Sequence, residues 1–218
     1  MQGDKVCIAA LHRDGALRLH NPSPREHWLQ SIGGLTPGDI VSLTWKLPRS
    51  YHRPHVEDRD WNPAMFGKID RLPEDRLIER LSANAFRSIV DAFGEPCFYS
   101  ENGNPAFTPG RSSRSLASVL ARSIRARPHQ AGVRVSFIDE HQEWSTIPLE
   151  DFVVRQHQTQ CRGCSSYLSK LLVSEFEGDR ALLRMGLTRQ FQAEGRTPAC
   201  YLQVNHIFLM PSQRKHFV

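Results

Sequence analysis

Residues 116–138 read LASVLARSIRARPHQAGVRVSFI, and this stretch decides the fold class. Gly132–Ile138 alternates apolar and polar residues, which predicts a β-strand with one buried face. Leu116–Arg127 is ambiguous, because its apolar residues fit either one face of a helix or a strand. Pro128 ends either element, since proline disfavours helical backbone at the residue before it.

Similar strand-like runs lie on both sides of this stretch. They are Lys5–Leu11, Ala16–His20, Asp39–Leu47, Glu143–Pro148, Phe152–Arg155, Ala181–Phe191 and Cys200–Met210. Asp14-Gly15 predicts a hairpin between the first two runs, and Thr36-Pro37-Gly38 predicts a turn before the third. Short strands separated by frequent turns are typical of small barrels or sandwiches, so we expect a mainly β protein.

One helix is expected between the two β-rich halves, over residues 74–93. Pro73-Glu74-Asp75 is typical of a helix start, and Gly94 is placed to end it. Leu77, Ile78, Leu81, Ala85 and Ile89 recur at helical spacing. We therefore expect a first small barrel at 1–72, a connecting helix at 73–95, a second barrel at 96–211 and a tail at 212–218.

The net charge of +5 comes from a single window of the sequence. Residues 102–138 contain six arginines and no acidic residue, whereas charges nearly cancel on either side. Arginine outnumbers lysine by 23 to 5, and arginine binds phosphate through two parallel hydrogen bonds. The window predicts either a surface for a polyanion or a solvated arginine-rich face.

Composition indicates a soluble globular protein, with 39% hydrophobic and 23% charged residues among 218. No apolar run is long enough to span a membrane, and Val6–Leu11 is too short for a secretory signal. The five cysteines are odd in number and widely spaced, which does not suggest a disulfide framework. We therefore expect a cytoplasmic protein with no membrane partner.

Four segments together resemble the dual OB-domain family of prokaryotic conflict and defence systems. They are the opening hairpin at 5–19, Leu35–Val41, His52–Asp58 with Trp61 after it, and the closing strand at 199–204. The resemblance spans most of the chain, and it implies two OB-like barrels in tandem and nucleic-acid binding. It also implies an accessory role beside a partner such as a helicase or nuclease subunit, and it transfers no catalytic residue.

The expected function is that of a non-catalytic module that binds nucleic acid, more often single-stranded. OB barrels bind single strands by base stacking beside a basic groove. The residues expected to contact nucleic acid are Arg111, Arg114, Arg122, Arg125, Arg127 and Arg134, with Tyr99, Phe107 and Trp144 as stacking platforms. The main alternative is a protein–protein adaptor whose basic window docks an acidic partner subunit.

Two further clusters have the residue types of a metal site or an acid–base pair. His52, His55, Glu57 and Asp58 would support a metal-dependent nuclease, but their spacing fits no established site. We expect them to position a ligand or to fix a loop. Cys161 and Cys164 form a Cys-x-x-Cys pair without a second ligand pair, so we favour two free thiols over zinc. We expect no metal and no cofactor.

Overall fold

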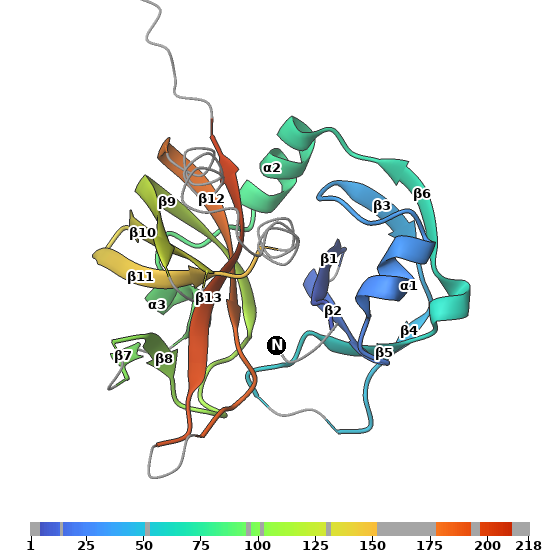
Figure 1. The fold of residues 1–218 in the computed structure, drawn as a ribbon, viewed down its shortest axis with the longest axis horizontal. Coiled ribbons are helices and arrows are strands. Elements are labelled where there is room, and N and C mark those ends of the chain that lie inside the picture. Colours follow the sequence, from blue (N-terminus) through green and yellow to red (C-terminus); the bar gives the residue numbers. More distant parts are fainter. Residues whose placement is uncertain are drawn as a thin grey trace, which may run out of the picture.

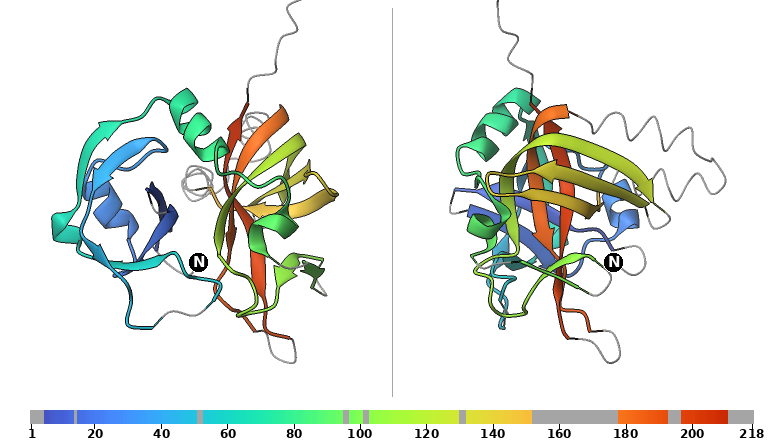
Figure 2. Two further views of the ribbon diagram at one scale, coloured as in Figure 1. Left: turned by 180° about the vertical axis from the view of Figure 1, so that it is seen from behind. Right: turned by 90° about the vertical axis from the view of Figure 1, so that its left-hand side faces the viewer.

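The computed structural model describes residues 5–13, 15–50, 53–94, 97–100, 103–129, 132–151, 178–192 and 197–210. The protein is mainly β, as the sequence predicts. Two β-rich halves lie side by side, and helix α2 bridges them at one end (Figures 1 and 2). No helix among these residues is long and apolar enough to cross a membrane.

The N-terminal half contains two small sheets. A four-stranded sheet has the order β1-β2-β5-β4, and a separate antiparallel pair joins β3 to β6. The elements are β1 (Ile8–His12), β2 (Gly15–Asn21), α1 (Glu26–Ser31), β3 (Asp39–Ser42), β4 (Trp45–Lys46), β5 (Asp58–Trp61), the 3₁₀ turn η1 (Pro63–Met65) and β6 (Gly67–Arg71). Among the described residues no strand pairing joins the two sheets.

The C-terminal half is built on five long strands that pair in a ring. They are β9 (Leu116–His129), β10 (Gly132–Ile138), β11 (Glu143–Leu149), β12 (Gly178–Leu187) and β13 (Cys200–Leu209). The order β11-β10-β9-β12-β13 closes through a parallel contact between Leu149 and Val204. The short strands β7 (Phe98–Tyr99) and β8 (Pro105–Phe107) extend the sheet beyond β13.

The ambiguous segment Leu116–Arg127 is the first part of β9, and the structure explains the ambiguity. Ala117, Val119 and Ala121 face the main core inside the ring. Leu120, on the opposite face, packs in a separate cluster with Leu81 of α2. Both faces are therefore apolar here, which hides the alternation that normally identifies a strand.

The single helix expected over 74–93 is wrong, because the structure has two helices there. Helix α2 spans Glu74–Ser82 and helix α3 spans Ile89–Phe93. Between them Phe86 forms a β-bridge with Val119 of β9, which requires extended backbone. Ser88 then starts α3 by accepting a hydrogen bond from the Asp91 amide, and Gly94 ends it at φ 76°.

Other differences concern boundaries and polar segments. The run Asp39–Leu47 is divided into two strands, and the polar segment 50–62 contains β5. Helix α1 and strand β6 also lie in segments for which no element was predicted. The expected strand at Phe152–Arg155 and the tail at 212–218 lie outside the described residues.

Helix α2, which links the two halves in the chain, packs on the C-terminal half through its apolar face. Leu81 is buried against Leu182 of β12 and Phe208 of β13, with Leu77 and Ile78 packed around them. Its other face carries an exposed ion pair between Arg76 and Glu79. Most of the apolar face predicted from helical spacing therefore packs against the outside of the ring, namely Leu77, Ile78, Leu81 and Ala85. Ile89, the last residue predicted for this face, lies instead in the main core.

We expect Leu81→Ala to lower the free energy of unfolding by about 2–5 kcal/mol, because it removes buried methyl groups and leaves a cavity. Arg76→Ala, on the exposed face of the same helix, should change it by less than about 0.5 kcal/mol. Urea unfolding of both variants measures the difference. Equal midpoints for Leu81→Ala and the parent would show that the packing of α2 on the ring does not stabilise the protein.

Candidate functional site

Five exposed or half-exposed arginines share the outer face of the ring. Arg122, Arg125 and Arg127 come from β9, Arg134 from β10 and Arg180 from β12. Arg127 pairs directly with Arg134, and Arg122 pairs directly with Arg180. Like charges placed directly opposite each other in a sheet are destabilising. None of the five forms an ion pair with a described carboxylate. We call this set the basic face.

A β-bulge at Ser123 brings the β9 arginines to the same side. The ladder places Arg125 opposite Ser136 and Arg122 opposite Ile138, so β9 has one more residue than β10 in this interval. Ser123 has φ 53°, in the left-handed region that few non-glycine residues adopt. In a regular strand, residues three positions apart such as Arg122 and Arg125 would point to opposite faces, and the bulge corrects this.

Arg134 is held in place on the basic face by neutral partners. Its guanidinium donates to Asn104 Oδ1 and to the Thr146 carbonyl, each at 3.1 Å. Arg111 and Arg114 precede β9 and are not part of the basic face. The Arg114 guanidinium lies 4.6 Å above the Phe86 ring, and its Nε is buried without a hydrogen-bond partner. Of the six arginines predicted to contact nucleic acid, four therefore lie on the basic face, whereas Arg111 and Arg114 lie outside it.

The prediction that Phe107 and Trp144 are stacking platforms is wrong. Both side chains have 0% exposure, and they pack in the main core. Trp144 donates its indole N–H to buried Asp139 at 2.8 Å, which satisfies the only polar group of the side chain. Neither ring can meet a base on the surface.

Tyr99 differs from these two aromatic residues, because it is 53% exposed. It pairs with Pro105 of β8, next to the Asn104 that binds Arg134. Its ring centroid lies 6.5 Å from that of Trp144, so the Tyr99 ring packs against a residue of the main core. Tyr99 is therefore an exposed aromatic ring at the margin of the basic face.

Glu57 connects the two halves. Its carboxylate accepts hydrogen bonds from the Ser115 amide, the Ser115 hydroxyl and the Leu116 amide, at 2.9–3.2 Å. Glu57 and Ser115 are both buried. These bonds fix the start of β9 to the N-terminal half, and they engage both carboxylate oxygens.

Asp58 binds two arginines, Arg18 within its own half and Arg189 across the junction. One oxygen accepts from Arg18 of β2 at 2.7 Å, and the other pairs with Arg189, which follows β12. His55 accepts from Arg18 at 2.7 Å. Burial, together with the Arg18 and Arg189 charges, lowers the pKa of His55 to about 3, although Asp58 opposes this shift. His55 is therefore neutral near pH 7, and its buried ring N–H at Nε2 has no hydrogen-bond partner among the described residues.

These contacts assign His55, Glu57 and Asp58 to the junction between the halves, where each is already engaged by protein groups. His52 lies outside the described residues, as do Cys161 and Cys164. Arg18 and Arg189 were not singled out in the sequence. The two residues lie far apart in the chain. The only feature of the sequence that indicates such cationic partners is the acid-rich segment Glu57–Asp60, whose Asp58 binds both arginines in the structure.

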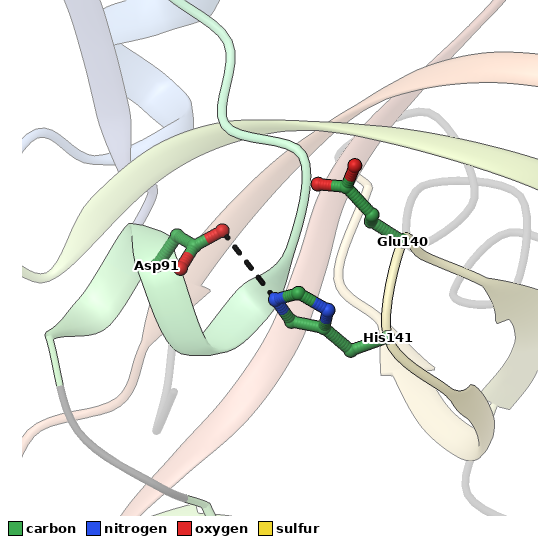
Figure 3. A group of neighbouring side chains, drawn as sticks. All are labelled: Asp91, Glu140 and His141. Carbon is green, nitrogen blue, oxygen red and sulfur yellow. Dashed lines mark ion pairs between the residues drawn. The ribbon is translucent and has the colours of Figure 1, made fainter.

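A different trio of possible metal ligands lies at the other side of the ring (Figure 3). Asp91 comes from α3, and Glu140 and His141 come from the turn between β10 and β11. His141 Nε2 lies 3.7 Å from Asp91, and Arg87 lies 3.4 Å from Glu140. Buried Asp139 holds the two segments together by accepting from the Ile89, His141 and Gln142 amides. All three possible ligands are exposed.

Comparison with known proteins gives no family assignment. No protein-family model matches the chain, and no match was found among curated proteins or solved structures.

Proposed function

We propose that the C-terminal half is an OB-like barrel that binds nucleic acid without catalysis. Five strands pair in the order first, second, third, fifth, fourth, and the ring closes between the third and the fifth. This Greek-key order in a five-stranded barrel is that of an OB fold. A second barrel in the N-terminal half, and membership of the dual OB-domain family, rest on the sequence resemblance.

The proposal of a nucleic-acid ligand rests on the basic face. Two pairs of arginines lie directly opposite each other, with no described carboxylate paired to them. Such a surface costs stability through repulsion, and a polyanion removes that repulsion when it binds. Arginine is suited to this ligand, because its planar guanidinium binds phosphate oxygens in pairs.

Tyr99 favours a single strand over a duplex. Bases of a single strand are free to stack on an exposed aromatic ring, whereas those of a duplex are paired and stacked on each other. The arginines would bind successive phosphates along β9 while Tyr99 stacks on a base. This combination predicts binding with little sequence preference.

The basic face would also suit an acidic partner protein, which is the adaptor alternative. No feature of the five arginines distinguishes a carboxylate-rich surface from a phosphate backbone, but Tyr99 favours bases. The nuclease alternative is weaker, because Glu57 and Asp58 use their oxygens within the protein. We propose an accessory role beside a helicase or nuclease subunit, on the strength of the resemblance.

We expect the purified chain to bind a single-stranded oligonucleotide with an affinity that falls steeply as salt rises, because bound arginines release counterions from the phosphates. Fluorescence anisotropy between about 50 and 200 mM salt measures this effect. A duplex of the same length should bind more weakly. Absence of binding at the lowest salt would refute the proposed function and would leave the adaptor alternative.

A further inference from the structure

A partly open cavity of about 700 Å³ lies between the two halves, apart from the basic face. Its N-terminal wall is mainly apolar and includes Ile8, Val41 and Leu43. Leu77 and Leu81 of α2 contribute to it as well. The volume is in the range of small-molecule sites, which are typically mostly apolar with a few polar groups placed together.

One group of polar residues in the cavity comes from the outer face of β12 and β13, and Arg80 of α2 also lines the cavity. Arg184 of β12 pairs directly with His206 of β13 and with Ser118 of β9, which places these three side chains in one row. Arg184 and His206 both line the cavity, as does Asn205 beside them. A Cβ on Gly186 would lie 2.5 Å from the Asn205 amide nitrogen, so the glycine leaves room for this amide.

Arg184 is a cation with one neutral partner. Its guanidinium donates to the Ser118 hydroxyl at 2.6 Å, and no described carboxylate forms an ion pair with it. Burial lowers the pKa of Arg184, and the more distant Glu57 opposes this shift. A guanidinium has five N–H donors, so most of its hydrogen-bonding capacity is available to a ligand.

His206 is oriented by an acidic partner. Its Nδ1 pairs with buried Asp151, which leaves the opposite ring nitrogen as the second polar group of the row. Three carboxylates line the cavity: Asp39, Glu150 and Asp151. Asp39 pairs with Lys68 at 3.1 Å, and Asp151 pairs with His206. Glu150 forms no ion pair with another residue that the structure describes.

We propose that this cavity binds a small organic anion, with a carboxylate or phosphate on Arg184 and an apolar body against the N-terminal half. An anion would supply the charge partner that Arg184 lacks. The apolar walls would cover the rest of the ligand, and burial of that surface would add to the affinity. This site is independent of the proposed nucleic-acid binding, because none of the five arginines of the basic face lines the cavity.

The fluorescent aromatic sulfonate 1-anilinonaphthalene-8-sulfonate is a suitable probe, because it joins an anion to an apolar body. We expect saturable binding to the folded chain, and a Kd about tenfold or more higher for Arg184→Met, since a charged hydrogen bond is lost. Arg76→Met, an exposed arginine of α2, is the matched control and should bind as the parent does. Circular dichroism melts verify that each variant is folded.

Competition then identifies the anion. Decanoate should displace the probe if the site takes a carboxylate, and decyl phosphate should do so if it takes a phosphate. Decanol should displace the probe far less well. Should Arg184→Met fail to fold, Arg184→Gln tests the same position of the row and should also weaken binding. Equal probe binding by a folded variant of the row, or equal competition by decanol, would overturn the proposal.

Discussion

Replacing Arg122, Arg125 and Arg127 together with alanine is expected to remove most nucleic-acid binding. If each arginine neutralises one phosphate of a single strand, the salt dependence of log K should become less steep by about 2 units. The variant should melt at the parent temperature or above it, because two pairs of opposed like charges are relieved. Anisotropy titrations at several salt concentrations and a thermal melt measure both effects.

The matched control for this variant is the triple change Arg49→Ala, Arg71→Ala and Arg76→Ala. These three arginines are exposed in the N-terminal half and in α2, so the control removes the same net charge elsewhere. It should keep the affinity and the salt dependence of the parent to within a factor of about two, since distant exposed charges are screened. Equal losses in the two triple variants would show that only the net charge matters.

Glu57→Ala should destabilise the protein by about 3 kcal/mol or more. The change leaves the Ser115 and Leu116 amides and the Ser115 hydroxyl without their acceptor, and a buried donor without a partner is costly. Glu57→Gln retains one carbonyl acceptor and should lose less. Chemical unfolding gives the free energies.

Glu79→Ala provides the comparison for an exposed acid, because its ion pair with Arg76 is solvent-exposed. Exposed pairs contribute about 0–1 kcal/mol, so this variant should differ little from the parent. If Glu57→Ala were as stable as Glu79→Ala, the bonds across the junction would not hold the halves together. In that case the position of β9 relative to the N-terminal half would have another cause.

The mainly β class follows from local patterns in the sequence. Gly132–Ile138 alternates cleanly, because one face meets the core and the other meets solvent, and its predicted bounds agree with β10. Strand β5 was missed because Asp58, Arg59 and Asp60 are charged. Asp58 is nevertheless buried there, since Arg18 and Arg189 neutralise it from distant parts of the chain. The sequence pattern around Asp58 contains no information about partners that lie so far away in the chain.

The basic face was predictable only in part, for the same reason. Four of its five arginines lie in the acid-free window, whereas Arg180 follows Asp179 in a segment of balanced charge. Arg180 joins the set through its pairing with Arg122 across β9 and β12. The burial of Trp144 was also hidden, because it depends on Asp139 and on the bulge in β11 that turns Trp144 and Ile147 to the same side.

The closing contact of the ring has a consequence for the order of folding. Strands β9, β10 and β11 are joined by short turns, so they can pair soon after the chain collapses. The parallel contact of Leu149 with Val204 joins positions far apart in the chain, and the loop-closure entropy must be overcome before it forms. We therefore expect the meander of β9–β11 to form early and the closure of the ring between β11 and β13 to be the slow, final step of folding.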